Sequence, residues 1–174
     1  LASQIEPLLS GGTGSVSHTE EVPSFLPDRF EPGTPNIPGI LGLHAALCDL
    51  EQTDMGKLHQ HELELTQYFI NGLMQMDPSE STLRAIGKHN TIERTSVVSV
   101  QTLQTDMARV AYEMDDTYGI MTRVGLHCAP SAHKTLGTYP EGTIRFSFGP
   151  ENTHHEVDLA LHALAEITGS PYHL

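Results

Sequence analysis

Apolar residues recur at helical spacing through the first half of the chain, and the pattern predicts two successive helices. The first starts near Asn36, with Pro38 in its first turn, and carries four apolar residues on one face: Ile40, Leu43, Leu47 and Leu50. The second begins after Thr53 and is ended by Pro78. Its aligned residues are Leu58, His61, Leu65, Phe69, Leu73 and Met76.

From about Leu83 the period shortens to two, which is typical of strands. Residues 96–100 and 120–124 are rich in β-branched side chains and are predicted to be strands. Residues 143–148 give the clearest alternation. There, Ile144, Phe146 and Phe148 share one face, while Arg145 and Ser147 share the other.

Two further helices complete the pattern. One is expected to be capped by Thr105 and closed by Gly119, with Met107, Val110, Ala111 and Met114 facing inward. The last begins with a capping box at residues 153–156 and ends near Gly169 and Pro171. The order α, α, β, α, β, β, α predicts an α/β fold, an α+β small domain in which helices cover a small sheet.

Residues 1–39 are rich in Gly, Pro, Ser and Thr and contain two glycine-bearing loops, at residues 10–15 and 31–36. This stretch has too few periodic apolar residues to fold alone, so we expect it to lie on another part of a protein. The chain opens at Leu1 rather than at Met, which suggests a truncated piece.

The charge balance excludes several classes of partner. The 174 residues include 22 Asp and Glu but only 9 Lys and Arg, and no basic cluster is present, so nucleic acid and anionic membrane surfaces are not expected partners. No apolar run approaches the roughly 20 residues of a membrane span, and the start does not resemble a signal peptide. The 2 cysteines cannot form a disulfide framework, which favours a reducing, cytoplasmic compartment.

Cys128 is a candidate nucleophile because it follows a predicted strand and precedes a loop expected to last until Thr143. The neighbouring His127 could favour the thiolate, which is the reactive form of a cysteine. The alternative is a buried, inert cysteine. That alternative is our interpretation of Cys48, which lies within the first predicted helix.

Two arginines near this cysteine are candidate ligands for a carboxylate. Arg145 projects from the predicted strand away from its apolar face, and Arg123 precedes Cys128 by five residues. The planar guanidinium binds both oxygens of a carboxylate at once. The alternative is that each arginine forms a structural salt bridge with one of the many acids.

The glycine loops suit an anion, because backbone N–H groups and a hydroxyl such as that of Thr34 can approach a phosphate. Neither loop matches Gly-x-Gly-x-x-Gly or the Walker pattern, so a plain turn stays open. The 11 histidines include His59, His61 and the pair His154 and His155. They lack metal-binding spacings, and no metal site is expected.

Several segments together resemble a known family. Residues 29–36, which end in Gly33-Thr34-Pro35-Asn36, resemble the Gly-Thr-Pro-Asn signature of class V aminotransferases, in the branch of cysteine desulfurases and selenocysteine lyases. Residues 123–130 resemble the Arg-x-Gly-x-His-Cys-Ala loop of that branch. Residues 142–147 and 152–158 resemble its closing strand and helix, and the similarity extends from Gly11 to about Ile167.

The resemblance implies the C-terminal part of a fold-type I enzyme that uses pyridoxal 5′-phosphate (PLP). Residues 1–45 would be a remnant of the large PLP-binding domain, and residues 46–174 the small C-terminal domain with the cysteine loop. Members are usually homodimers. The lysine that binds PLP covalently precedes the first glycine loop in this family, whereas Lys57, Lys88 and Lys134 stand in unrelated contexts. The chain alone is therefore expected to be inactive.

The resemblance also implies roles for individual residues. Cys128, preceded by His127, matches the cysteine that attacks the substrate sulfur and becomes a persulfide. Arg145 and Arg123 match arginines of the site that binds the substrate carboxylate. Thr34, which follows Gly33, matches a residue that reaches the PLP phosphate of the neighbouring subunit.

The implied reaction removes sulfur, or selenium, from cysteine or a related amino acid and leaves alanine and a persulfide, which a sulfur-acceptor protein could take. Two alternatives stay open. One is a class V aminotransferase or another PLP lyase in which Cys128 is incidental. The other is a non-catalytic acidic domain that binds a protein partner.

Overall fold

The structure, a computed structural model, describes residues 1–171. It divides into two compact units, residues 1–53 and a second unit that begins at Asp54. The sequence analysis predicted a different kind of boundary, at residue 45, between the large and the small domain of a longer enzyme. That boundary stays a prediction.

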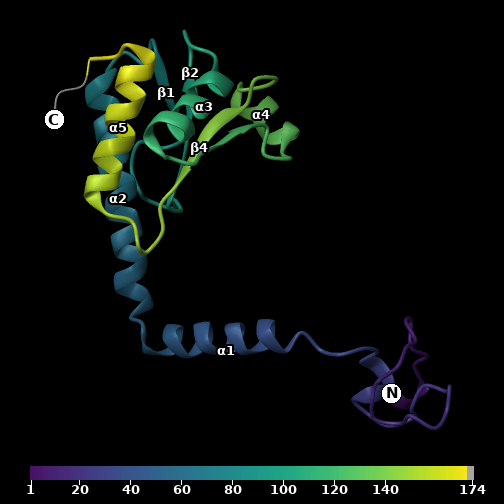
Figure 1. The fold of residues 1–174 in the computed structure, drawn as a ribbon. Coiled ribbons are helices and arrows are strands. Elements are labelled where there is room, and N and C mark those ends of the chain that lie inside the picture. The colour runs from purple at the N-terminus through teal and green to yellow at the C-terminus, as the bar shows by residue number, and fades with distance from the viewer. Residues whose placement is uncertain (172–174) are drawn as a thin grey trace. The chain divides into compact units, whose positions relative to one another are not determined.

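The first unit contains two short 3-10 helices, η1 (Ala2–Gln4) and η2 (Asp28–Phe30), and one long helix, α1 (Ile37–Gln52) (Figure 1). The side chain of Asn36 caps α1 by accepting a hydrogen bond from the Gly39 N–H at 3.1 Å. The predicted first helix is therefore confirmed, with its expected start.

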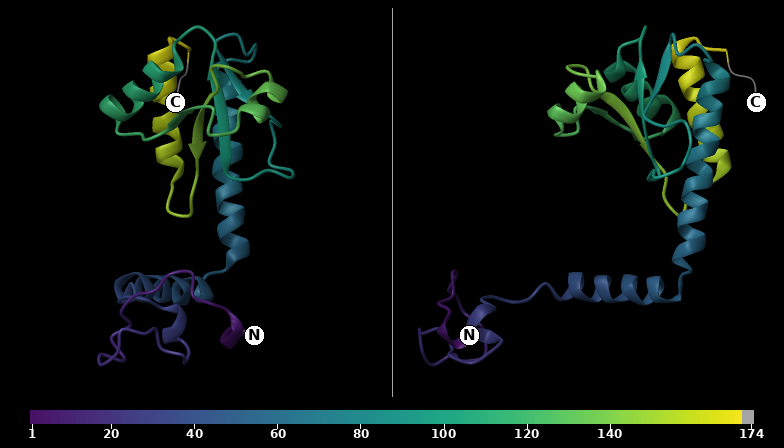
Figure 2. Two further views of the ribbon diagram at one scale, coloured as in Figure 1. Left: turned by 90° about the vertical axis from the view of Figure 1, so that its right-hand side faces the viewer. Right: turned by 180° about the vertical axis from the view of Figure 1, so that it is seen from behind.

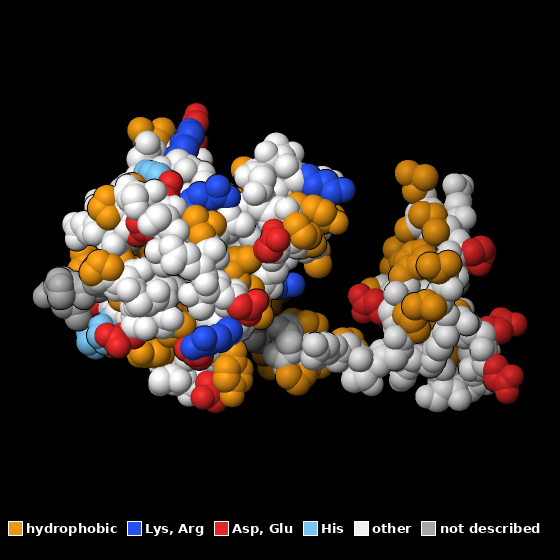
Figure 3. Space-filling model, turned by 90° about the horizontal axis from the view of Figure 1, so that it is seen from above, with side chains coloured by type: hydrophobic (Ala, Val, Ile, Leu, Met, Phe, Trp, Pro, Cys, Tyr) orange, Lys and Arg blue, Asp and Glu red, His pale blue; other side chains and the backbone are white. Residues whose placement is uncertain are grey.

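The apolar face of α1 is exposed. No residue of α1 is buried, and the four apolar residues that share its predicted face are 44–61% exposed: Ile40, Leu43, Leu47 and Leu50. Hydrophobic side chains also gather on the visible face of the unit formed by residues 1–53 (Figure 3). Within the unit formed by residues 1–53, nothing covers this helix.

The second unit is built on a four-stranded antiparallel sheet with the order β1-β2-β4-β3. Its strands are β1 (Leu83–Ile86), β2 (Val97–Thr102), β3 (Arg123–Gly125) and β4 (Thr143–Ser147). The predicted strands near residues 96–100 and 143–148 are confirmed. The strand predicted at residues 120–124 begins only at Arg123, and β1 was not predicted as a separate strand.

Three long helices cover one face of this sheet: α2 (Met55–Met76), α3 (Met107–Tyr118) and α5 (His154–Thr168). Figures 1 and 2 show α2 and α5 on one side of the strands, with α4 (Pro130–Leu136) on the other side. The core forms between the helices and the apolar face of the sheet. Phe69 of α2 packs there against Phe146 and Phe148, with ring centroids 4.7 and 5.3 Å apart.

Side-chain caps define the helix starts. Thr153 and Glu156 form the predicted capping box, which is confirmed. The prediction that Thr105 caps α3 is wrong: Asp106 accepts the hydrogen bond from the Arg109 N–H at 2.8 Å. The Thr105 carbonyl instead accepts the Thr102 hydroxyl at 2.6 Å, which places residue 105 outside the helix.

The segment between Cys128 and Thr143 is not one continuous loop, and that prediction is wrong. It contains α4, which has Pro130 in its first turn and Gly137, with a left-handed φ of 68°, as its C-cap. The helix has only 7 residues, too few for an apolar period to be recognised. Within residues 1–171, none of the helices combines the length and the apolar character that crossing a membrane requires.

Candidate active site

Strand pairing brings the two predicted arginines together. Arg123 of β3 lies directly opposite Arg145 of β4, and Ser99 of β2 lies on the other side of Arg145. Residues directly opposite each other in an antiparallel pair project from the same face, with Cβ atoms about 5 Å apart. That face is opposite to the one that buries Ile144 and Phe146. The sequence prediction for the direction of Arg145 is confirmed.

Neither of these arginines has an acidic partner among the described residues. Within residues 1–171 the side chains of Arg123 and Arg145 form no ion pair, whereas Arg29 and Arg109 each contact a glutamate. Like charges that face each other across strands destabilise a sheet. A pair of unpartnered guanidinium groups in an acidic chain suits an anionic ligand that both can contact, such as a carboxylate. The alternative of structural salt bridges finds no support in these contacts.

Cys128 lies in a tight turn between β3 and α4 and is exposed. The turn is closed by a hydrogen bond from the Ala129 N–H to the Leu126 carbonyl at 2.8 Å. Both His127 and Cys128 have left-handed backbone angles, with φ of 48° and 60°. This conformation costs a non-glycine residue about 1–2 kcal/mol. The surrounding contacts must therefore hold the turn.

His127 provides one of those contacts. Its Nε2 lies 3.3 Å from the hydroxyl of buried Thr143, while its Nδ1 is buried with no hydrogen-bond partner among the described residues. Burial lowers the pKa of His127, and the positive charge of Arg145, with smaller effects of His133 and Arg123, lowers it further. The ring is therefore neutral at pH 7.

The neutral state of His127 changes what it can do for the thiol. A neutral imidazole supplies no positive charge to favour a thiolate, and within residues 1–171 it forms no hydrogen bond with Cys128. The positive charge near the turn comes instead from Arg145 and Arg123. Cys48 is in a different setting: it is half-buried on α1, with its Sγ 3.8 Å from the ring nitrogens of His44.

Two buried residues beside the turn were missed in the sequence. His133 of α4 is 6% exposed and its Nδ1 lies 2.7 Å from the hydroxyl of Thr138, which is fully buried. The His133 ring also contacts the His127 ring, with centroids 5.9 Å apart. The spacing of Pro130 and Gly137 could have pointed to these two residues, because a proline and a glycine at this distance indicate the start and the end of a short helix.

Gly142 closes the other end of this segment. Its φ is +83°, and a Cβ at this position would collide with the carbonyl of Gly125 in β3. Its N–H donates to the Thr138 carbonyl at 2.7 Å. The close approach of Gly142 to Gly125 therefore fixes the turn to the edge of the sheet.

The predicted phosphate ligands lie in the first unit. Gly33 adopts a φ of +87°, and its N–H donates to the Gly12 carbonyl at 2.7 Å, so this amide is already occupied. Thr34 is exposed, and its hydroxyl has no partner among the described residues. The hydroxyl can therefore donate a hydrogen bond to a phosphate oxygen. The structure thus leaves Thr34, rather than the Gly33 amide, as the available donor.

The three lysines have other partners. Lys57 lies 3.9 Å from Asp54, and Lys88 lies 2.8 Å from Glu93. Lys134 stands over the ring of Tyr139, 5.0 Å from its centroid. None of these settings resembles an enclosed site for covalent attachment of a cofactor.

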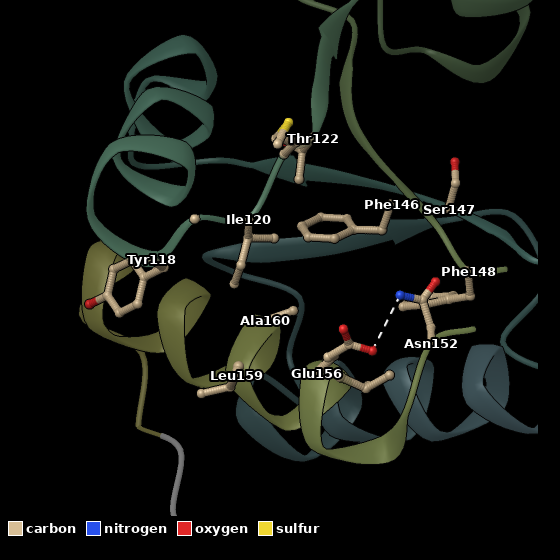
Figure 4. Close-up of a pocket in the computed structure, with 13 residues that line it drawn as sticks. Tyr118, Ile120, Thr122, Phe146, Ser147, Phe148, Asn152, Glu156, Leu159 and Ala160 are labelled. Atoms are coloured by element: carbon tan, nitrogen blue, oxygen red, sulfur yellow. Dashed lines mark hydrogen bonds between the residues drawn. The ribbon is translucent and has the colours of Figure 1, made fainter. Parts of the chain in front are cut away.

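A pocket of about 340 Å³ lies elsewhere in the second unit, between the lead into β3, the end of β4, and α5 (Figure 4). Its lining includes Ile120 and Thr122, which precede β3, and Phe146 of β4. Asn152 donates to Glu156 at its rim, at 3.4 Å. Neither Cys128 nor the two arginines line it, so this pocket is separate from the candidate site.

Two of the histidines singled out in the sequence, His61 and His154, have individual partners. His61 Nε2 lies 2.9 Å from the Asn152 carbonyl, and the His154 ring meets the Tyr68 ring edge-on at 5.0 Å. Among residues 1–171 there is no group of three or more His, Cys, Asp or Glu that could hold a metal ion.

The sequence and the fold together place the chain in a family. The sequence model of the class V aminotransferases matches residues 1–160, and the chain belongs to this family. A probable cysteine desulfurase of Staphylococcus epidermidis is 33% identical over 168 residues, which cover 95% of this chain and 39% of that protein. The chain therefore spans about two fifths of the length of such relatives.

Solved structures agree with this assignment. The apo structure of a cysteine desulfurase from Thermococcus onnurineus superimposes with a TM-score of 0.72 at 33% identity, over 94% of this chain and 39% of that one. A cysteine desulfurase from Escherichia coli gives a TM-score of 0.64 at 26% identity, over 92% of this chain and 38% of that one. The predicted family and the predicted fold class are both confirmed.

Proposed function

We propose that this chain is the C-terminal part of a PLP-dependent cysteine desulfurase, with Cys128 as the sulfur-accepting residue. The observation that carries the proposal is an exposed cysteine in a left-handed turn, next to His127, on which the charges of two facing arginines act. Among the described residues these arginines have no acidic partner. The desulfurase names of relatives that cover nearly the whole chain support the same reaction class.

Arg145 and Arg123 bind the carboxylate of the substrate cysteine. Arg145 is half-buried at the centre of the sheet and makes the two-point contact, while exposed Arg123 adds charge from the edge strand. The two positive charges, which repel each other in the free protein, are neutralised by the bound carboxylate. Binding by the arginines brings the substrate sulfur within reach of Cys128.

Cys128 then accepts the sulfur. Its thiolate forms an S–S bond with the substrate sulfur as the carbon–sulfur bond of the substrate breaks. The electron pair of the broken bond remains on the carbon, which takes up a proton and becomes the methyl group of alanine. The products are alanine and a persulfide on Cys128, and a selenium substrate follows the same course.

PLP, when bound, supplies the electron sink for proton loss at the substrate Cα. In this chain Thr34 would hold the cofactor phosphate of a neighbouring subunit in a homodimer by donating a hydrogen bond from its hydroxyl, and the left-handed Gly33 would shape the loop. The covalent lysine belongs to the rest of the enzyme, because Lys57, Lys88 and Lys134 are engaged elsewhere. The isolated chain is therefore inactive. We also propose that the enzyme is cytoplasmic and that its partner is a sulfur-acceptor protein.

The test compares Cys128→Ala with Cys48→Ala in the full-length enzyme, incubated with PLP and L-cysteine. Cys128→Ala is expected to abolish persulfide and sulfide formation while the cofactor spectrum stays unchanged. Cys48→Ala, the matched control, is expected to keep wild-type turnover. Unchanged sulfide release by the Cys128 variant would overturn the proposal.

The same incubation separates the alternatives. An amino acid converted without sulfide would indicate a transaminase or another lyase. The absence of any cofactor spectrum would indicate a non-catalytic domain.

A further inference from the structure

The cysteine turn contains two consecutive non-glycine residues in the left-handed region, His127 and Cys128. Glycine adopts this region readily and Asn, Asp and His are enriched in it, whereas it is uncommon for cysteine and for two non-glycine residues in succession. Such residues keep this conformation only where surrounding contacts determine it. The hydrogen bond from the Ala129 N–H to the Leu126 carbonyl closes the turn but does not by itself select the left-handed conformation.

Side-chain contacts reach the turn from two directions. From the sheet, the hydroxyl of Thr143 meets His127 Nε2 at 3.3 Å. From α4, the ring of His133 packs against the ring of His127, with centroids 5.9 Å apart. His127 is therefore held between a strand and a helix.

His133 is itself fixed by Thr138, across the C-terminal end of α4. The Thr138 hydroxyl lies 2.7 Å from His133 Nδ1, and the Thr138 N–H donates to the His133 carbonyl at 2.9 Å. The Thr138 carbonyl in turn accepts the N–H of Gly142, which abuts β3. Both His133 and Thr138 are buried, so this arrangement is shielded from water.

We propose that His133 is a positioning residue for the sulfur-accepting cysteine, and that its hydrogen bond to Thr138 keeps Cys128 in the left-handed, exposed turn. His133 acts through His127 and, among the described residues, does not contact the thiol, so it is not a catalytic residue. The proposal rests on the proposed function, because it assigns a role in presenting Cys128 to the substrate sulfur.

The test uses the full-length enzyme with two substitutions at Thr138. Thr138→Val keeps the shape of the side chain but removes the hydroxyl, and Thr138→Ser keeps the hydroxyl. Thr135→Val is the matched control, since Thr135 is exposed on α4, the helix of His133, and its hydroxyl donates only to the Ser131 carbonyl. His133→Phe keeps a ring beside His127 and removes both ring nitrogens.

We expect Thr138→Val and His133→Phe to lower kcat for persulfide formation about tenfold to hundredfold, while KM for cysteine stays within about twofold. The cost of the left-handed conformation corresponds to about tenfold for each residue that relaxes. Thr138→Ser is expected to restore kcat, and Thr135→Val to leave it unchanged.

A second readout uses the 174-residue chain and follows the His127 ring by NMR as pH is varied. Releasing His133 exposes the His127 ring to water, so its pKa is expected to rise toward the ordinary value of 6.5 in Thr138→Val and to return in Thr138→Ser. A purely structural role of Thr138 would lower the melting temperature without moving kcat or this titration. If His133→Phe does not fold, the two Thr138 variants decide.

Wild-type kcat and an unmoved His127 titration in Thr138→Val would overturn the positioning role. Failure of the proposed function is a separate result, because it requires that Cys128→Ala still release sulfide. Loss of sulfide in Cys128→Ala together with normal kcat in Thr138→Val would retain the function and remove His133 from it.

Discussion

The substitution Arg145→Lys tests whether Arg145 binds the substrate carboxylate or only stabilises the fold. Lysine keeps the positive charge but loses the planar, two-point contact with a carboxylate. Hydrogen bonds to charged groups contribute about 1.5–3 kcal/mol. The substitution is therefore expected to lower kcat/KM for cysteine about tenfold to hundredfold in the full-length enzyme.

The same substitution is expected to change stability little. Arg145 has no hydrogen bond or ion pair among the described residues, and it faces the like charge of Arg123. Its apolar neighbours on the strand, Ile144 and Phe146, are buried on the other face and are not disturbed. The free energy of unfolding should stay within about 0.5 kcal/mol of the wild type.

Arg94→Lys is the matched control. Arg94 donates hydrogen bonds to the carbonyls of Lys88 and Val97 and is partly buried. Its replacement leaves these acceptors with poorer partners, so we expect a loss of about 1–3 kcal/mol in stability with normal kcat/KM. The two arginine variants should thus show opposite effects on kinetics and on stability.

The assay measures melting temperature and steady-state kinetics on the same preparation of each variant. A large fall in melting temperature with intact turnover in Arg145→Lys would refute the assignment, because it is the behaviour of a structural arginine. If both variants lose melting temperature and kcat/KM to the same extent, the contacts described for Arg94 and Arg145 do not distinguish the roles of these two residues.

Three further predictions concern stability and the cofactor. Burial would raise the pKa of Asp77, but hydrogen bonds from Leu83, Thr82, Ser79 and Ser81 outweigh it and lower the pKa from 3.8 to about 2. The stabilisation is therefore present above pH 4 and lost as pH falls toward 2, so the stability difference between wild type and Asp77→Asn, followed by denaturant unfolding, should shrink over that interval. Gly142→Ala should lower the free energy of unfolding by about 2–4 kcal/mol, because the cost of a left-handed alanine adds to the collision of its Cβ with the Gly125 backbone. Gly119 is also left-handed but has open space around it, so Gly119→Ala should lower the free energy of unfolding by only about 1–2 kcal/mol in the same assay. The chain alone should bind no PLP covalently, and a borohydride-fixed label on one of its lysines would contradict this.

Local pattern determined the four longer helices and the strand β4. The caps at Asn36 and at residues 153–156 use side chains within three residues of the amide groups they satisfy, so short-range chemistry specifies them. The alternation along β4 likewise fixed which way Arg145 projects. The family resemblance rests on motifs in the same order along one chain, which a sequence shows completely.

Tertiary structure decided which residues meet. The register that sets Arg123 opposite Arg145 joins strands separated by the cysteine turn and α4, and no local period encodes it. His127, next to Cys128 in the turn, contacts His133 and Thr143, which approach from a helix and a strand. The sequence therefore determined the longer elements and the family. The tertiary structure decided which strands pair and which side chains surround the cysteine turn, because those contacts come from a strand and a short helix that no repeating pattern relates.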